Sequence, residues 1–207
     1  MTDTQKTKKE YILEAAAGLF HENGYKATSM RGLAERVGLR QASSLYSHYS
    51  SKEEMLRDIC FNNAHKFLDG LVAICQQGQG PIDQLRALIR LHISIATEDA
   101  TSIIVFNDEW RHLSSEPLTE FLDLRKEYES KVRHIIQEGI DQGQLRRIDP
   151  STVLYTILAA LRWLHYRPRK IVETKDKNVL QEEMEILLLS GLKEEAVSTP
   201  SLASSQK

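Results

Sequence analysis

The chain has 207 residues, of which 41% are hydrophobic and 27% are charged, a length that suits one large domain or a small domain followed by a larger one. Its net charge of −2 argues against a protein that coats DNA nonspecifically, because such binding depends on a broad positive surface. Gly and Pro number 10 and 5, and the apolar residues recur at helical spacing, so the sequence predicts an all-α fold.

The cysteines and histidines give no sign of a disulfide framework or a metal site. Cys60 and Cys75 fall on one predicted helix, too far apart to bridge within the chain, and we expect two buried thiols. The seven His are scattered without a Cys-x-x-Cys or His-x-x-x-His pair, so we expect hydrogen-bonding roles for His48, His92 and His134. We therefore expect no metal and no cofactor.

The sequence shows no secretory signal and no apolar run long enough to cross a bilayer. It also lacks the cysteine framework of many small secreted proteins. We therefore expect a cytoplasmic protein that does not enter the membrane.

Residues 28–38 have the features of a short amphipathic helix with defined ends. Thr28 or Ser29 can cap its N-terminus by accepting a hydrogen bond from an otherwise unpaired backbone N–H. Three- and four-residue spacing predicts one buried face, formed by Met30, Leu33, Ala34 and Val37. Gly38 ends the helix, because glycine adopts the left-handed conformation of a helix C-terminus at little steric cost.

A second short helix is predicted from about Gln41 to Tyr49, with Leu45 as its inward anchor. Its other side chains can nearly all form hydrogen bonds, and they are Arg40, Gln41, Ser43, Ser44, Tyr46, Ser47 and His48. Two short helices joined by a glycine turn predict a helix-turn-helix, whose second helix enters the major groove of DNA. A polar surface helix in an ordinary bundle is the alternative interpretation.

Three motifs, in the expected order, are similar to those of the TetR/AcrR family of bacterial transcriptional regulators. The segment from Leu19 to Ser29, LFHENGYKATS, resembles the family's LF..NGY..TS signature. The segment from Leu33 to Gly38, LAERVG, is the second match. The segment from Leu45 to Glu54, LYSHYSSKEE, resembles the family's LY.HF.SKEE, which joins the recognition helix to helix four.

The resemblance implies a three-helix DNA-binding domain over residues 1–52 and assigns roles within it. Phosphate would be contacted by Thr28, Ser29, Tyr46 and Lys52. Bases would be read by Arg40, Gln41, Ser43 and Ser44, and Ser47 and His48 complete the expected DNA-binding residues. The alternatives are that Thr28 only caps a helix and that Tyr46 only packs, half-buried, against its neighbours.

The spacing from Gly38 to Leu45 is one residue longer than is common in the family. One residue rotates a helix by about 100°. The base-reading roles of Gln41, Ala42 and Ser43 therefore depend on where the helix begins.

Residues 53–193 are predicted to form a second helical domain for ligand binding and dimerisation. Helix four, from Lys52 to about Gln77, is expected to be shared with the first domain, and Gly78 to Pro81 end it. Further helices are expected at residues 82–97, 102–113, 118–143, 150–167 and 176–192. Residues 194–207, rich in Ser, are expected to form a disordered tail.

The last two predicted helices carry more apolar surface than one neighbour needs. In the resembled family the final two helices of each subunit form a four-helix dimer interface, and residues 151–166 and 177–192 would fill that place. A wholly intramolecular core is the alternative. A homodimer suits a palindromic operator, because its paired recognition helices enter successive major grooves about 34–36 Å apart.

Two clusters of polar and aromatic residues are candidates for recognising a small molecule. The candidate ligand-binding residues are Phe106, Glu109, Trp110, Arg125, Tyr128, Arg162, Trp163 and Tyr166. Arg125 falls on an otherwise apolar stripe, where an unpaired charge is costly, so we expect it to pair with Glu109 or with an anionic ligand. The alternatives are an internal salt bridge for Arg125 and plain packing for Trp110 and Trp163.

Residues 107–111, NDEWR, and 124–129, LRKEYE, resemble a TetR branch associated with fatty-acid or steroid degradation. The ligands of that branch are acyl-coenzyme A thioesters. The resemblance implies an acyl-CoA effector, whose phosphates would meet Arg162 or Arg167 near the mouth of the cavity.

These observations predict a dimeric, ligand-responsive DNA-binding regulator rather than an enzyme. The effector would shift helix four and release the repressor from its operator. One alternative is a helical enzyme using Glu109, His112 and Arg125, although no nucleophile–base pair or cofactor loop accompanies them. Another is an activator or a protein-binding member of the same fold.

Overall fold

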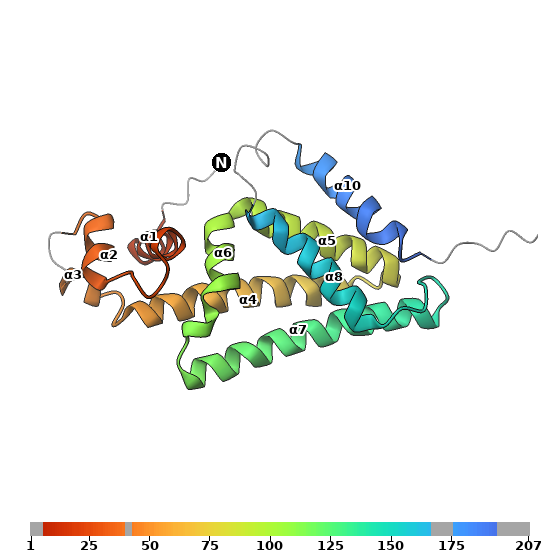
Figure 1. Cartoon of the computed structure of the whole chain (residues 1–207), viewed down its shortest axis with the longest axis horizontal. Helices are drawn as coiled ribbons and strands as arrows, with labels where there is room; N and C mark the ends of the chain where they lie inside the picture. The colour runs from red at the N-terminus through yellow and green to blue at the C-terminus, as the bar shows by residue number, and fades with distance from the viewer. Residues whose placement is uncertain (1–5, 40–42, 167–175, 194–207) are drawn as a thin grey trace, which may run out of the picture.

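The computed structural model describes residues 6–39, 43–166 and 176–193, and all regular elements in these ranges are helical (Figure 1). One isolated antiparallel bridge joins Leu145 to Lys193. The predicted all-α fold is confirmed. The predicted tail at 194–207 lies outside the described residues.

The helices form a small N-terminal group and a larger body. The N-terminal group contains α1 (Lys8–Asn23), α2 (Met30–Arg36) and α3 (Ser43–Tyr46). From it, α4 (Lys52–Gln76) runs into the body, as Figure 1 shows. The body contains α5 (Pro81–Glu98), α6 (Ala100–Asp108), the 3-10 turn η1 (Trp110–His112), α7 (Ser115–Asp141), α8 (Pro150–Trp163), the 3-10 turn η2 (Leu164–Tyr166) and α10 (Lys177–Ser190).

Local capping sets several of these helix boundaries. Asp149 accepts a hydrogen bond from Thr152 N–H (2.8 Å) and Pro150 is the first residue of α8, as predicted. Asp99 is the one residue between α5 and α6, and it caps α6 by accepting a hydrogen bond from Ser102 N–H (3.0 Å). The segment expected as one helix at 102–113 is therefore α6 followed by η1.

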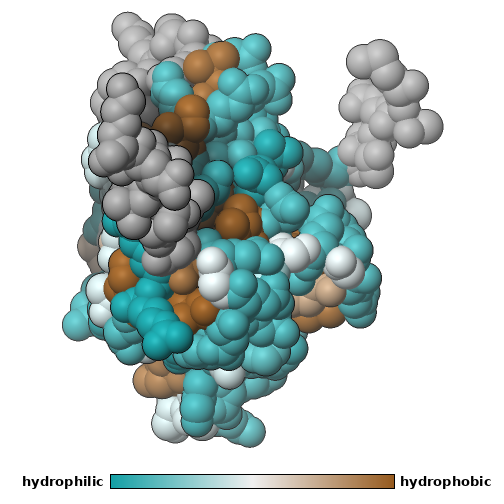
Figure 2. All heavy atoms as spheres, turned by 90° about the vertical axis from the view of Figure 1, so that its right-hand side faces the viewer, coloured by the Kyte–Doolittle hydropathy of each residue, from teal (hydrophilic) through white to brown (hydrophobic). Residues whose placement is uncertain are grey.

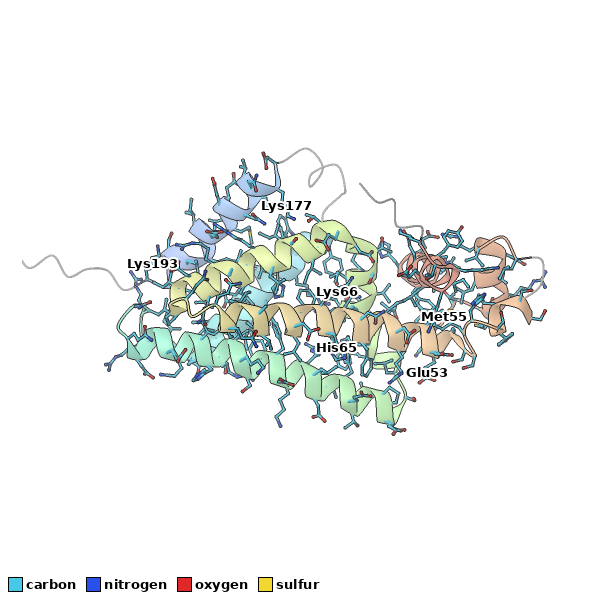
Figure 3. All side chains as sticks on the ribbon, turned by 180° about the vertical axis from the view of Figure 1, so that it is seen from behind. Glu53, Met55, His65, Lys66, Lys177 and Lys193 are labelled. Atoms are coloured by element: carbon cyan, nitrogen blue, oxygen red, sulfur yellow. The ribbon has the colours of Figure 1, made fainter. Side chains whose placement is uncertain are left out.

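α4 supplies side chains to both hydrophobic cores. Its first half packs in the core around α1–α3, with Met55, Leu56, Ile59, Cys60, Phe61 and Ala64. Its second half packs in the core of the body, with Phe67, Leu68 and Leu71. Figure 3 shows Met55 at the end of α4 beside the N-terminal helices and His65 farther along toward the body.

The core around α1–α3 extends into the second predicted domain. This core buries Phe20 of α1 together with three residues of the second domain, which are Val105 of α6, Leu113 just after η1, and Phe121 of α7. Ser114 N–H donates to Glu53 Oε1 (2.8 Å) and ties the start of α7 to the start of α4 (Figure 3). A boundary at residue 52 stays a prediction, and side chains from both sides of it share one core.

α10 is attached to α5 by a nearly buried carboxylate. Glu185, 9% exposed, accepts from Arg90 Nε (2.5 Å) and lies 3.0 Å from Arg86 Nε. Leu180, Met184 and Leu189 of α10 are buried against the body.

One prediction about the cysteines was wrong. Cys60 is buried and its pKa is raised to about 12, first by burial and then by the charge of Glu109, but Cys75 is exposed. Across the described residues, no helix has the length and apolar character to span a membrane.

Gly139 of α7 is predicted to be required for close packing. A Cβ at this position would lie 2.6 Å from Leu145 Cδ1 and 3.2 Å from Pro81 Cβ. We expect Gly139→Ala to lower the free energy of unfolding by about 1–3 kcal/mol, because overpacking outweighs the helix propensity gained. The measurement is urea unfolding followed by circular dichroism.

Gly18→Ala is the matched control, because Gly18 also lies in a helix and its nearest neighbour for a Cβ is Arg36 Nη1 at 3.7 Å. This variant should be as stable as the parent or more stable. Equal effects of the two substitutions would contradict the packing argument.

Candidate functional site

α2 and the turn after it have the geometry predicted for a helix-turn-helix. Ser29 is the N-cap and accepts a hydrogen bond from Gly32 N–H (3.1 Å). Gly38 has φ of +73°, and the following Leu39 N–H donates to Ala34 C=O (2.9 Å). The chain therefore reverses at the glycine and leads toward α3.

Among the described residues, α3 ends earlier than the predicted Tyr49 and presents polar side chains to solvent. It spans Ser43–Tyr46, and residues 47–48 follow it as a turn rather than as helix. Leu45 and Tyr49 are buried and anchor the segment. The side chains left at the surface are those of Ser43, Ser44, Tyr46 and Ser47, with His48 half-buried. Arg40 and Gln41, predicted to read bases, lie outside the described residues.

Tyr49 locks the end of this segment to the helices behind it. Its hydroxyl donates to Asp58 Oδ2 (3.1 Å), and Lys9 of α1 lies 3.3 Å from the same carboxylate and over the Tyr49 ring. Burial, with the nearby Asp58 charge, raises the pKa of Tyr49. The face formed by Ser43, Ser44, Tyr46 and Ser47 is therefore held on a fixed base.

The hydroxyl of Thr28, predicted to contact phosphate, is directed into the protein in this structure. The residue is 5% exposed, and its Oγ1 lies 3.0 Å from Gly24 C=O and 3.3 Å from Leu19 C=O, so its proton is directed inward. The Thr28 N–H is also occupied, by Tyr25 C=O (3.3 Å). Thr28 holds the loop between α1 and α2, and Ser29 next to it caps α2.

The ammonium of Lys52, also predicted to contact phosphate, is bound to backbone carbonyls in this structure. Its ammonium donates to the carbonyls of Tyr25 (2.8 Å), Thr28 (2.8 Å) and Lys26 (3.2 Å). The same ammonium lies 4.4 Å from the centre of the Tyr25 ring. An ammonium has three protons, and all three are directed at this loop, so Lys52 fixes the entry to α2.

A second feature, inside the body, is an apolar cavity of about 300 Å³. It lies between α4, α5, α6, α7 and α8, and its lining residues are Ala64, Phe67, His92, Phe106, Asn107, Leu124, Arg125, Tyr128, Glu129, Tyr155, Leu158, Ala159 and Arg162. The volume is at the lower end of the roughly 300–1,000 Å³ typical of small-molecule sites.

His92 and Tyr128 supply a buried polar pair to the cavity wall. His92 Nε2 lies 2.6 Å from the Tyr128 hydroxyl, and both residues are at most 9% exposed. The ring of Phe67 packs at 4.6 Å from the imidazole. Burial raises the pKa of Tyr128, so its phenol stays protonated and able to donate. The hydrogen-bonding role predicted for His92 is confirmed.

Charged side chains line the more exposed part of the cavity. Arg125 is exposed and its guanidinium lies over the Trp110 ring at 5.2 Å. Glu129 accepts from Tyr155 hydroxyl (3.0 Å) and from Arg133 (3.4 Å). The cavity therefore combines an apolar interior with a polar, partly cationic mouth.

Arg162 completes this mouth and is shared with two neighbours. Its Nη2 lies 2.6 Å from Asp108 Oδ1, and the Tyr166 hydroxyl donates to the same oxygen (2.6 Å). Burial first, then the bond to Asp108, raises the pKa of Tyr166. Asp108 thus has two partners from the end of α8 and from η2.

Half of the predicted ligand-binding residues line the cavity and half do not. Phe106, Arg125, Tyr128 and Arg162 line it, whereas the residues outside its lining are Glu109, Trp110, Trp163 and Tyr166. The expected ion pair between Arg125 and Glu109 is absent from the described residues, because Glu109 faces His112 Nε2 (3.3 Å). Arg125 is exposed, so it needs no buried counter-ion.

The other three residues outside the lining have different places. Trp110 packs on Phe121 at 5.9 Å, Trp163 is 55% exposed, and Tyr166 supports Arg162 from outside. Three further lining residues could not be distinguished in the sequence from core residues, because apolar and aromatic side chains at helical spacing look the same in both places; they are Phe67, Tyr155 and Leu158. In the part of the chain that the structure describes, no group of three metal-ligating side chains occurs.

Comparison with known proteins links both features to one class of protein. Residues 12–59 match the family model of bacterial regulatory proteins of the tetR family, and residues 78–169 match the tetracyclin repressor-like C-terminal domain. The chain is 28% identical over 177 residues to the HTH-type transcriptional repressor KstR2 of Rhodococcus jostii, an alignment that covers 81% of this chain and 83% of that protein.

Solved structures have the same fold. The ketosteroid transcriptional regulator KstR2 of Mycobacterium tuberculosis has a TM-score of 0.80 at 23% identity, covering 92% of this chain and 97% of that one. AibR, solved in complex with isovaleryl coenzyme A and operator DNA, has a TM-score of 0.75 at 23% identity, covering 87% and 97%.

Lys52 and Tyr46 are predicted to affect DNA binding in different ways. Lys52→Met removes three hydrogen bonds to the loop before α2, so we expect unfolding free energy to fall by about 1.5–3 kcal/mol and DNA affinity to fall with it. Tyr46→Phe removes an exposed hydroxyl, so we expect weaker DNA binding with stability unchanged within about 0.5 kcal/mol. Thermal unfolding and fluorescence anisotropy with operator DNA measure the two quantities.

Tyr11→Phe is the control for Tyr46→Phe, since Tyr11 is an equally exposed tyrosine on α1. It should leave both quantities unchanged. Full stability in Lys52→Met would show that the three Lys52 hydrogen bonds do not stabilise the loop before α2. Full DNA affinity in Tyr46→Phe would refute the assignment of α3 to DNA binding.

Proposed function

Because this chain belongs to the TetR family of transcriptional regulators, we propose that it is a homodimeric repressor whose effector is an acyl-coenzyme A. Its proposed activity is binding and release of operator DNA rather than catalysis. The observation that carries the proposal is that α4 joins the core behind α3 to the helices that line the cavity. An event in the cavity can therefore move the DNA-binding helices.

The DNA-binding part of the proposal rests on the exposed polar side of α3. Tyr46 is 52% exposed beside Ser43, Ser44 and Ser47, and hydroxyl groups of this kind bind phosphates and base edges. Ser29 stands at the N-terminus of α2, next to Thr28, whose carbonyl accepts a hydrogen bond from Lys52. We also propose that Arg40 and Gln41 read bases.

The proposed ligand class follows from the two ends of the cavity. Phe67, Phe106 and Leu158 offer an apolar site for an acyl chain, and Arg125 and Arg162 offer guanidinium groups for phosphates. The cavity of about 300 Å³ favours a short or medium acyl chain, with the coenzyme itself outside. Arg167, the other arginine considered for the phosphates, lies outside the described residues.

The proposed dimer uses α8 and α10. These helices expose large apolar side chains, namely Tyr155, Trp163, Val179, Ile186 and Leu187. Figure 2 views the end of the molecule opposite α1–α3 and shows apolar surface among hydrophilic residues there. A symmetric interface would bury this surface twice and place two α3 helices on one operator.

The proposed mechanism is a change in the position of α4 when ligand enters. Ala64 and Phe67 line the cavity, and Ile59 and Cys60, about one turn earlier on the same helix, pack behind α1–α3. A coupling of roughly 1–3 kcal/mol would lower operator affinity about 5- to 150-fold. The effector needs only to bind the DNA-free form better.

The dimer is tested by placing a charge on α10. Leu187 is 73% exposed, and we expect Leu187→Glu to give monomers, because each dimer loses two buried leucines worth roughly 1.5–3 kcal/mol each. Sedimentation velocity measures the oligomeric state. Leu122→Glu on α7, at a position 42% exposed, is the control and should remain dimeric. A dimeric Leu187→Glu variant would exclude this interface.

The regulatory function is tested with DNA from the region upstream of the gene that encodes this chain. We expect tight binding that weakens with salt, because phosphate contacts release counterions. Adding octanoyl-CoA should weaken binding about 5- to 150-fold, whereas free coenzyme A should have little effect because it lacks the acyl chain. Absence of binding at low salt would contradict the regulator, and binding indifferent to octanoyl-CoA would contradict the ligand class.

A further inference from the structure

Asp108 forms an ion pair with Arg162, an arginine that is proposed to bind the anionic group of the ligand. Arg162 lines the cavity, and its Nη2 lies 2.6 Å from Asp108 Oδ1. The Tyr166 hydroxyl donates to the same oxygen, at 2.6 Å, and lies 3.2 Å from Arg162 Nη2. A carboxylate oxygen bound by a guanidinium and a phenol has the surroundings that a ligand carboxylate or phosphate oxygen would require.

The ion pair between Asp108 and Arg162 is exposed enough for a ligand anion to replace the Asp108 carboxylate. The side chain of Arg162 is 50% exposed and that of Asp108 is 37% exposed. Exposed ion pairs are weak compared with the same pair in a buried site. An anion that also places an apolar tail in the cavity gains burial that Asp108 cannot offer, and it can therefore displace the Asp108 carboxylate from Arg162.

Asp108 also stands at a joint between the cavity and the DNA-binding helices. It is the last residue of α6, and η1 begins two residues later at Trp110. α6 packs against α1, and His112 of η1 stacks on Tyr25 with ring centres 5.3 Å apart. Tyr25 belongs to the loop that Lys52 clamps before α2.

We propose that Asp108 is a built-in substitute for the ligand's anionic group on Arg162, and that its displacement frees the end of α6 and η1 from α8. Once Asp108 is released from Arg162, the end of α6 and η1 shift against Tyr25 and move the loop that positions α2 and α3. This inference rests on the proposed function and names the residue that selects an anionic ligand. It adds a path through α6 and η1 to the one through α4.

The proposal predicts opposite effects of one substitution on two ligands. Asp108→Asn keeps the shape but removes the competing charge, so the protein should bind octanoyl-CoA more tightly and operator DNA more weakly without ligand. In an equilibrium between a DNA-binding form and a ligand-binding form, a substitution that destabilises the first form relative to the second lowers DNA affinity and raises ligand affinity. We expect at least about a 5-fold change in each affinity, in opposite directions.

The experiment measures both affinities for the full-length protein by titration calorimetry with octanoyl-CoA and by anisotropy with operator DNA. Asp83→Asn is the matched control, because Asp83 pairs with Arg86 on α5, away from the cavity lining, and it should change neither affinity. Arg162→Met should weaken operator binding as Asp108→Asn does, but without the gain in octanoyl-CoA affinity. Tyr166→Phe should act like a weaker Asp108→Asn and replaces it should that variant not fold.

The outcomes separate this inference from the function on which it rests. Parent protein that binds operator and releases it with octanoyl-CoA, with Asp108→Asn indistinguishable from it, would overturn the inference and leave the function standing. Loss of both affinities in Asp108→Asn and in Tyr166→Phe would also overturn it. Octanoate tested in place of octanoyl-CoA distinguishes a free carboxylate from the coenzyme phosphates as the anion.

Discussion

The structure depends on one uninterrupted helix that belongs to two hydrophobic cores. α4 buries Met55, Leu56 and Ile59 behind the helix-turn-helix and Phe67 and Leu71 in the body. A helix of this kind is stiff along its axis because each turn is hydrogen-bonded to the next. Its start is fixed by the Ser51 cap and its end by packing on α5 and α7. Under the proposed mechanism, a displacement at the cavity would therefore be passed on to α1–α3 rather than absorbed between them.

A second constraint holds the entry to the DNA-binding helices. Lys52 donates to three carbonyls of the loop before α2, and Tyr25 of that loop stacks on His112 of η1. The same loop thus receives the first residue of α4 and the turn that follows α6. Both proposed routes from the cavity end at this loop, and we therefore propose that it sets the position of α2 and α3. Lys52 and Thr28, which were predicted to contact phosphate, both form hydrogen bonds with backbone carbonyls of this region.

Much of the fold could be predicted because its signals are local. Gly38 after the apolar stripe of α2 and the Asp149-Pro150 start of α8 each depend on a few neighbouring residues, and both were found. The roles of Lys52 and Arg125 were not predictable in this way. The partners of Lys52 lie more than 20 residues earlier in the chain, and the exposure of Arg125 depends on how α7 packs. His92 and Tyr128 likewise meet only after α5 and α7 pack together.

Ligand in the cavity is proposed to change the separation of the two groups of DNA-binding helices, α1–α3, in the dimer. This change is tested most directly by the distance between spin labels at Tyr11→Cys in the two protomers, with exposed Cys75 replaced by Ser and buried Cys60 retained. We expect one narrow distance distribution on operator DNA and a shifted or broader one with octanoyl-CoA. The same distribution in both states, with operator DNA released all the same, would contradict it.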